Sequence, residues 1–353
     1  MERQTDRRGA LVDAARPGFV PWFDVARAMA CLAVVVYHVI GSFGFELAPA
    51  RVIELNSNFV VRLRNVLPVF FFLSGVLAAR QLRRPTMEFI RTTSSRLLYP
   101  YVLWSVISVL VSAYVAGDAV NRNLEVRDLL VILWRPVLQY WYLLALLLYL
   151  IIVRAMWALR LPTWSVLGPA AGGLALVATD HGIDAYFPRM FAIHGIYLAT
   201  GIVAGERITG LVERGSDRRL LGVAAGGTVA VTAISWPGLS RGLSGIGAVA
   251  GGFIVLAALL CAAALLTRRH RPRWLLALGS RTLPVYVGHV IPAAGTRIVL
   301  VELGVRSFPV LLLCCLTAAV AGPLLLDALV RRYRVPFMFS LDRPGALTAS
   351  PAT

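Results

Sequence analysis

The sequence predicts an all-α, polytopic membrane protein with about ten transmembrane helices and both termini in the cytoplasm. Hydrophobic residues make up 58% of the 353-residue chain and charged residues only 15%, well below the quarter that is usual in soluble domains. The mean hydropathy is +0.73. Apolar runs of about 18 to 22 residues recur along the chain, as expected for helices that cross the hydrocarbon core of a bilayer.

The apolar segments follow one another with short polar connections. They cover residues 22–43, 66–80, 98–117, 137–153, 163–179, 189–205, 220–236, 244–266, 282–300 and 308–330. We expect residues 1–19 to form a polar, Arg-rich leader, residues 20–334 a single transmembrane domain, and residues 335–353 a flexible tail. No stretch between the segments is long enough for a soluble catalytic domain.

The positive charge is arranged as in a membrane protein rather than a nucleic-acid-binding protein. All 35 basic residues are arginines, and the net charge is +17. With both termini inside, 24 arginines lie on the inner side, 10 lie on the outer side, and Arg27 lies within the first segment. This asymmetry follows the positive-inside rule, so the expected polyanionic partner is the lipid of the plasma membrane.

Cysteine and glycine positions indicate packing roles. The four cysteines lie within apolar segments and lack the spacing of a disulfide or metal motif: Cys31, Cys261, Cys314 and Cys315. We therefore predict no metal site. The pairs Gly201…Gly205 and Gly247…Gly251 have the small-xxx-small spacing that allows helices to approach closely.

The first apolar segment carries three polar residues that are costly in lipid: Asp24, Arg27 and His38. Arg27 and His38 are eleven residues apart, which is three helical turns, so both point the same way about 16 Å apart. Asp24 precedes Arg27 by three residues and can pair with it. Taken singly, His38 could be an ordinary interhelical hydrogen-bonding residue, and Arg27 could extend toward the inner headgroups. Together the three residues predict a functional polar stripe.

Other segments contribute further candidates. Ser74 and Gly75 form a small polar spot among aromatic residues, although a packed helix interface explains them equally well. Arg91 and Arg96 precede a Tyr99-Pro-Tyr helix start at the inner surface, where they could bind phosphate or simply anchor the chain.

In the ninth segment, Tyr286 and His289 lie three residues apart on one helix face. Tyr142 lies in an aromatic run that by default would form an interfacial belt. On the outer side, four arginines could meet a glycan, although ordinary loop positions explain them as well: Arg62, Arg64, Arg127 and Arg135.

The motifs occur in an order that resembles a known family. They are Asp24-x-x-Arg27, Arg27-x₁₀-His38, FFFLSG at 70–75, RLLYPY at 96–101, WYL at 141–143 and LGS-x₅-Y-x₂-H at 278–289. Over residues 22–330 the chain is similar to the acyltransferase 3 family of integral membrane O-acyltransferases. It resembles the stand-alone type, which lacks the extra helix and the hydrolase-like domain of some members.

The resemblance implies transfer of an acyl group, usually acetyl from acetyl-CoA, to a hydroxyl of a sugar, glycan or glycosylated natural product. The family's essential Arg and His correspond to Arg27 and His38. Its inner-loop Arg-x-x-Arg-I-x-Pro motif matches at Arg96, whereas Thr93 occupies the position of the first Arg and Arg91 lies two residues earlier. The family's Y-x₂-H motif corresponds to Tyr286 and His289.

These expectations combine into one hypothesis. His38, supported by Arg27 and Asp24, would act as a general base or as an acyl carrier. Arg91, Arg96 and Tyr99 would hold the acyl-CoA, while Ser74, Gly75, Tyr142, Tyr286 and His289 would contact or support the substrate. No bound cofactor is expected.

Two other classes of protein stay open at this point. An exporter or flippase of a polar metabolite or lipid-linked sugar could use Asp24, Arg27 and His38 as a proton pathway. A scaffold for polysaccharide machinery would need none of the three.

Overall fold

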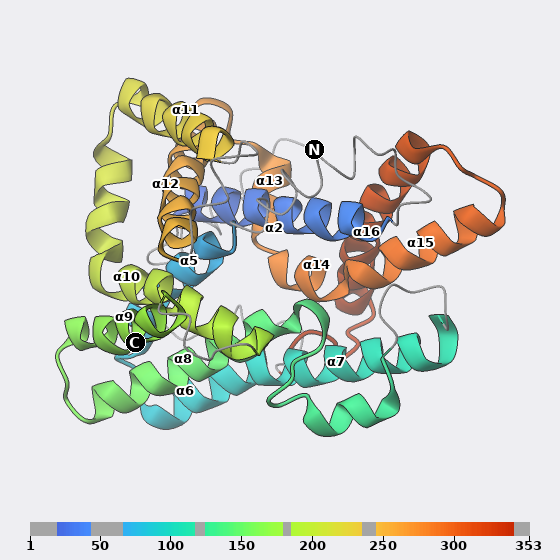
Figure 1. Cartoon of the computed structure of the whole chain (residues 1–353), viewed down its shortest axis with the longest axis horizontal. Helices are drawn as coiled ribbons and strands as arrows, with labels where there is room; N and C mark the ends of the chain where they lie inside the picture. The colour runs from blue at the N-terminus through green and yellow to red at the C-terminus, as the bar shows by residue number, and fades with distance from the viewer. Residues whose placement is uncertain (1–19, 44–65, 117–123, 179–184, 235–244, 342–353) are drawn as a thin grey trace.

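The computed structural model describes residues 20–43, 66–116, 124–178, 185–234 and 245–341. In these ranges the chain is almost wholly helical and contains no β-strand, which confirms the all-α class. Arg62 and Arg64 lie outside the described residues. The helices, labelled in Figure 1, are α2 (Pro21–Gly41), α5 (Leu67–Gln81), α6 (Thr86–Thr93), α7 (Tyr99–Val111), α8 (Trp141–Ala158), α9 (Leu167–Ala178), α10 (Tyr186–Arg214), α11 (Asp217–Ile234), α12 (Gly245–His270), α13 (Arg273–Gly279), α14 (Thr282–Gly288), α15 (Val290–Glu302) and α16 (Phe308–Arg332).

Six of the described helices are long and apolar enough to cross a bilayer, and the bent pair α14–α15 would make a seventh. Two shorter apolar helices, Leu67–Gln81 and Thr163–Val177, lie at two more of the predicted segments. The chain is therefore a helical membrane protein. The predicted number of about ten crossings and the cytoplasmic position of both termini stay predictions.

Helix α2 occupies the middle of the bundle (Figure 1), where it packs against α5, α12, α13 and α16. It begins at Pro21, whose fixed φ suits the first turn of a helix and whose missing N–H is no loss there. At its first turn the backbone of Asp24 touches Gly279, where an added Cβ would lie 2.0 Å from the Asp24 carbonyl oxygen. At its other end, the Arg297 side chain donates to the Ser42 carbonyl oxygen at 3.1 Å. Both ends of the helix that carries Asp24, Arg27 and His38 are thus fixed.

Glycines allow α5 and α10 to pack with their backbones in contact. A Cβ at Gly75 would lie 2.2 Å from the Leu198 carbonyl oxygen, and a Cβ at Gly201 would lie 2.2 Å from the Phe72 carbonyl oxygen. The predicted packing role of the Gly201…Gly205 pair is confirmed. The prediction for the second pair is wrong at Gly251, where a Cβ would meet nothing within 4 Å among the described residues.

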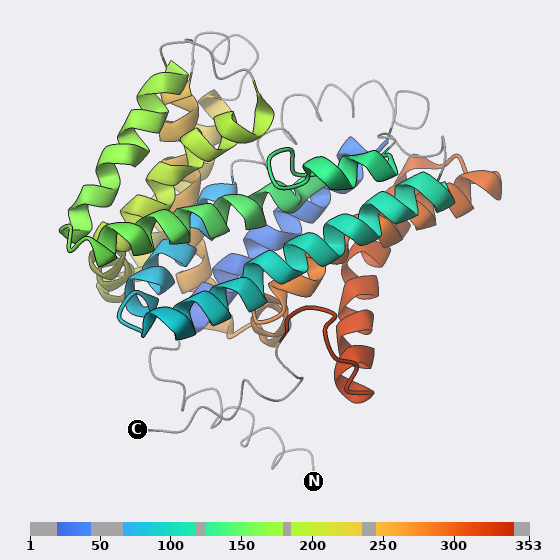
Figure 2. The ribbon, with the colours of Figure 1, turned by 90° about the horizontal axis from the view of Figure 1, so that it is seen from below.

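One continuous helix spans Thr86–Tyr114 and runs beside α8 (Figure 2). It includes a wider π-helical turn at Ser94–Leu98 between α6 and α7. The turn has a local cause, because Pro100 cannot donate an N–H to the carbonyl of residue 96 and its ring crowds that carbonyl. Arg154, near the end of α8, donates to the Leu82 carbonyl oxygen at 2.9 Å and to the Thr86 hydroxyl. The end of α8 is therefore tied to the start of this helix.

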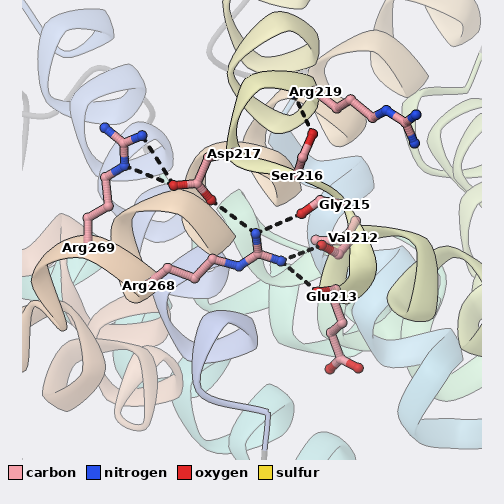
Figure 3. Close-up of polar contacts among 8 residues, drawn as sticks. All are labelled: Val212, Glu213, Gly215, Ser216, Asp217, Arg219, Arg268 and Arg269. Carbon is pink, nitrogen blue, oxygen red and sulfur yellow. Dashed lines mark hydrogen bonds and ion pairs between the residues drawn. The ribbon is translucent and has the colours of Figure 1, made fainter.

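A charged cluster joins α10, α11 and α12 at the turn after Arg214 (Figure 3). The Arg268 guanidinium donates to the carbonyl oxygens of Val212, Glu213 and Gly215 at 2.6–3.0 Å. These carbonyls end α10, so they lack helical partners and need such donors. Asp217, in the first turn of α11, accepts from Arg268 at 3.1 Å and from Arg269 at 3.2 Å. The two guanidinium groups lower the pKa of the Asp217 carboxyl below its usual value.

Candidate active site

Two histidines from distant parts of the sequence meet at the end of α2. His38 lies in the last turn of α2, and His289 lies at the bend between α14 and α15. Their ring centroids are 5.2 Å apart, with an angle of 50° between the rings. His289 is completely buried. The structure thus places the predicted supporting histidine directly beside the predicted catalytic one.

The bend that positions His289 follows from the local sequence. Helices α14 and α15 meet at 48°. Pro292 cannot donate to the carbonyl of Gly288 four residues earlier, so the helical hydrogen-bond ladder is interrupted at this point. Gly288 lies close to Pro323 of α16 and to the Trp104 ring, each within 3.4 Å of an added Cβ. The interruption turns the chain at the residue that faces His38.

The hydrogen bonds of His289 define its tautomer. Its Nδ1 lies 3.0 Å from the Val285 carbonyl oxygen and 2.9 Å from the Tyr286 carbonyl oxygen. Carbonyl oxygens only accept, so Nδ1 carries the proton and the neutral ring has its lone pair on Nε2. This Nε2 is buried and has no hydrogen-bond partner among the described residues. It is therefore an acceptor available to a nearby donor such as the ring N–H of His38.

A cavity of about 360 Å³, here called the His38 cavity, opens beside this pair. Its polar and aromatic lining comes from α2, from the residues at and just before the start of α8, from the start of α10 and from α14. The lining includes Tyr37, His38, Gln139, Trp141, Tyr186 and Tyr286. Its size falls in the range of small-molecule sites, about 300–1,000 Å³. His38 thus borders a space that is large enough for a substrate.

Gln139 is the site residue that the sequence did not reveal. Its side chain is only 3% exposed, and both amide atoms lack a hydrogen-bond partner within the described part of the chain. The Tyr286 hydroxyl donates to the Gln139 carbonyl oxygen, and the Tyr140 hydroxyl donates to the Val287 carbonyl oxygen at 2.9 Å. These two bonds fix the start of α8 against α14. In the sequence, the one indication of this site residue is that a single Gln stands directly before the aromatic run that starts at Tyr140.

Asp24 and Arg27 form the predicted pair at the other end of α2. Their side chains approach to 2.8 Å and are 10% and 24% exposed, respectively. Neither residue lines the His38 cavity. Arg27 lies three helical turns from His38, as the spacing of the two residues predicts. The ring beside His38 is that of His289. Arg27 lies within electrostatic range of the Tyr142 hydroxyl.

The predicted supporting residues fall into two groups. Ser74 and Tyr142 approach to 3.3 Å between their hydroxyl oxygens, and the Tyr142 and Tyr286 rings lie 5.4 Å apart. They form a polar and aromatic layer that leads from α5 to His289. Gly75 belongs instead to the contact between α5 and α10, which explains its presence without any substrate.

Of the predicted donor residues, Arg91 lies two residues after Phe89, which contacts Arg154 of α8, and Arg96 and Tyr99 follow further along the same helix. Arg91 and Arg96 are exposed, and Arg96 lies in the π turn. Tyr99 donates its hydroxyl hydrogen to the Phe337 carbonyl oxygen at 2.5 Å. Trp141 lines the cavity and Arg154 contacts the loop before α6, which at 1.5 Å per residue places the two ends about 20 Å apart. Arg91 and Arg96 therefore do not touch His38.

The fold and the site define a helical membrane protein with two neighbouring histidines, His38 and His289, beside a cavity. The family model described as an acyltransferase domain matches residues 20–328, nearly the whole chain. The chain therefore belongs to the acyltransferase 3 family, as its motifs predicted. Neither a curated protein nor a solved structure matches it.

Proposed function

We propose that this membrane acyltransferase moves an acyl group, namely acetyl, from acyl-CoA to a hydroxyl of a sugar, glycan or glycosylated natural product at the plasma membrane. The observation that carries the proposal is the position of His38. Its ring borders the His38 cavity and contacts a second histidine whose tautomer leaves an acceptor nitrogen without a partner among the described residues.

The chemistry needs a base and an acyl donor. In the proposed step, the ring N–H of His38 donates to Nε2 of His289, which leaves the other His38 nitrogen as the base. That nitrogen takes the proton of the acceptor hydroxyl, and the hydroxyl oxygen forms a bond to the thioester carbonyl carbon. The bond from carbon to sulfur then breaks, and the CoA sulfur leaves as a thiol with the proton from the imidazolium. The buried amide of Gln139 is a hydrogen-bond donor for the developing oxyanion.

The donor would reach His38 from the arginine-rich end. Arg91 and Arg96 are exposed cations that suit the phosphates of CoA. The distance of about 20 Å along α8 is comparable to an extended pantetheine arm. The ion pair of Asp24 and Arg27, three helical turns from His38 on α2, would help to orient the thioester arm.

The test is an acyl-transfer assay on membrane vesicles with radiolabelled acetyl-CoA. We expect His38→Ala to reduce ester formation by about 100-fold or more, since general-base catalysis contributes at least that much. The double variant Arg91→Ala/Arg96→Ala should raise the KM for acetyl-CoA. The control is Arg332→Ala, an exposed arginine at the end of α16, which should leave that KM unchanged.

Wild-type rates in His38→Ala would remove His38 from the mechanism. An unchanged KM for acetyl-CoA in the double variant would refute the donor assignment alone. An exporter would transport its cargo without any acyl-CoA-dependent labelling of an acceptor, so the same assay separates the two functions.

A further inference from the structure

A second cavity of about 600 Å³ adjoins the His38 cavity, and we call it the loop cavity. It lies between the short helix Val126–Val131, the segment Trp134–Leu138 and the start of α10. Leu138 and Tyr186 line both cavities, so the two spaces meet at these residues. The loop cavity is thus at the His38 end of α8, away from Arg91 and Arg96.

The junction between the cavities has an unusual backbone. Leu138 has a φ of +49°, in the left-handed region that side chains other than glycine rarely adopt. A leucine in this conformation persists only where its surroundings enforce it, and such positions concentrate at binding sites. The next residue is Gln139, whose buried amide lines the His38 cavity without a partner among the described residues. Both observations point to a ligand at this junction.

The charges that line the loop cavity balance one another. Glu125 and Arg127 form an ion pair at 2.8 Å, and the Asp128 carboxylate accepts from the Glu125 backbone N–H at 3.0 Å. Arg135 is the second cation of the lining. Two carboxylates and two guanidinium groups offer acceptors and donors without a net charge. Such a lining suits a neutral ligand with many hydroxyl groups better than a phosphate or a carboxylate.

Trp134 adds an apolar platform to this polar lining. Its side chain is 59% exposed, although it belongs to the cavity wall. An indole ring presents a broad apolar face together with one N–H donor. The C–H face of a pyranose ring can stack on such a surface while its hydroxyls meet the charged groups at the edge.

We infer that the loop cavity is the acceptor subsite of the enzyme and holds a neutral sugar ring on Trp134, so that a hydroxyl of the acceptor passes Leu138 and Tyr186 into the His38 cavity. This inference rests on the proposed function and names the class and the path of its acceptor. The competing explanation is that Trp134 anchors the loop in lipid headgroups together with Leu130 and Leu133, which are also exposed.

The experiment compares two acceptor probes with the same alkyl chain, hexyl β-D-glucoside and 1-hexanol. Purified protein in lipid nanodiscs receives radiolabelled acetyl-CoA, and the esters are separated and counted. Trp134→Ala should raise the KM for hexyl glucoside at least tenfold while leaving the KM for acetyl-CoA and the acylation of hexanol unchanged. Trp134→Phe, which keeps an aromatic face, should restore much of the affinity. The matched control is Trp274→Ala, a tryptophan of α13 that is 64% exposed and lines neither cavity.

The possible outcomes separate the subsite from the function. An unchanged KM for hexyl glucoside in Trp134→Ala would overturn the subsite and leave the proposed function standing. An equal loss with glucoside and hexanol would indicate anchoring or folding instead of sugar binding. Acylation of hexanol alone by the wild-type protein would overturn the sugar class. If the wild-type protein forms neither ester, the proposed function itself fails, and the subsite falls with it.

Discussion

The central feature at the scale of single residues is the contact between the half-buried ring of His38 and the buried ring of His289. Nδ1 of His289 carries the ring proton, because it faces two backbone carbonyl oxygens. Its Nε2 can therefore accept a hydrogen bond from His38. We propose that His289 does not react with the substrate. It would position the His38 ring and select its tautomer, as a carboxylate does for the histidine of a catalytic triad.

This role predicts a specific kinetic defect. His289→Gln should lower kcat by about tenfold or more, because the orientation of the base is lost, while the KM values for donor and acceptor change little. The pH dependence of kcat should also shift, since the ionisation of His38 would no longer be coupled to its neighbour. Steady-state kinetics across the pH range of activity measure both effects.

The chain offers a matched control for this substitution. His194 is also a buried histidine whose Nδ1 lies 2.8 Å from a backbone carbonyl oxygen, that of Met190. It does not line the His38 cavity. His194→Gln should therefore leave the shape of the pH profile unchanged. A profile altered equally by both substitutions would show that His289 has only a structural role.

At the scale of helices, the contact between α5 and α10 fixes the position of α5, which carries Ser74, the hydrogen-bond partner of Tyr142. Gly75→Ala would place a methyl group 2.2 Å from the Leu198 carbonyl oxygen. Backbone atoms cannot move aside as a flexible side chain can, so we expect a loss of about 1–3 kcal/mol in the free energy of unfolding. Thermal denaturation in detergent, followed by size-exclusion chromatography, should show a lower Tm.

The control for this prediction is an alanine in open space. A Cβ at Gly222 of α11 would meet nothing within 4 Å among the described residues. Gly222→Ala should be neutral or stabilising by about 0.5–1 kcal/mol, because alanine favours the helix. A Gly75→Ala protein as stable as Gly222→Ala would contradict the close contact between α5 and α10.

The charged cluster between α10, α11 and α12 predicts a dependence of stability on pH. Arg268 and Arg269 lower the pKa of Asp217, so the folded state favours the carboxylate. The stabilisation is present above the ordinary value of 3.8 and is lost as the pH falls through the lower pKa of the folded protein. Asp217→Asn should therefore lower the Tm modestly at pH 7, and the difference from wild type should shrink below about pH 3.8.

Salt provides the check on this account. The cluster is solvent-exposed, so added salt should screen it and reduce the difference in Tm between the two proteins. A difference that persists unchanged at acidic pH and at high salt would show that the ion pairs of Asp217 contribute nothing.

At the scale of the whole molecule, the sequence predicted what depends on local spacing and composition. The all-α membrane class, the family and the pair between Asp24 and Arg27 follow from hydropathy, motif order and a three-residue spacing. The contact between His38 and His289 joins residues 251 positions apart, and no periodicity can reveal such a contact. The same holds for Ser74 with Tyr142. The bend at His289 had a visible cause in Pro292, but only the packed structure shows that it faces α2.

Gln139 shows a different reason for an omission. In the sequence it reads as a polar residue at a helix start, where water or lipid headgroups would satisfy its amide. In the fold, the tyrosine hydrogen bonds at Gln139 and Val287 bury that helix start against α14. A residue that is unremarkable in the sequence thereby becomes an amide facing the His38 cavity.

At the scale of the whole membrane, the proposed function has the donor and the acceptor approach from opposite sides, with His38 between them. Because acetyl-CoA does not cross a sealed bilayer, the side from which it is used can be measured directly. Inverted and right-side-out vesicles from the same cells, formed with hexyl glucoside on both sides of the membrane and supplied with external radiolabelled acetyl-CoA, provide the comparison. We predict ester formation in inverted vesicles, little in sealed right-side-out vesicles, and none above background in either with His38→Ala. Equal use of external acetyl-CoA from both sides, or ester formation that persists in His38→Ala, would contradict the account.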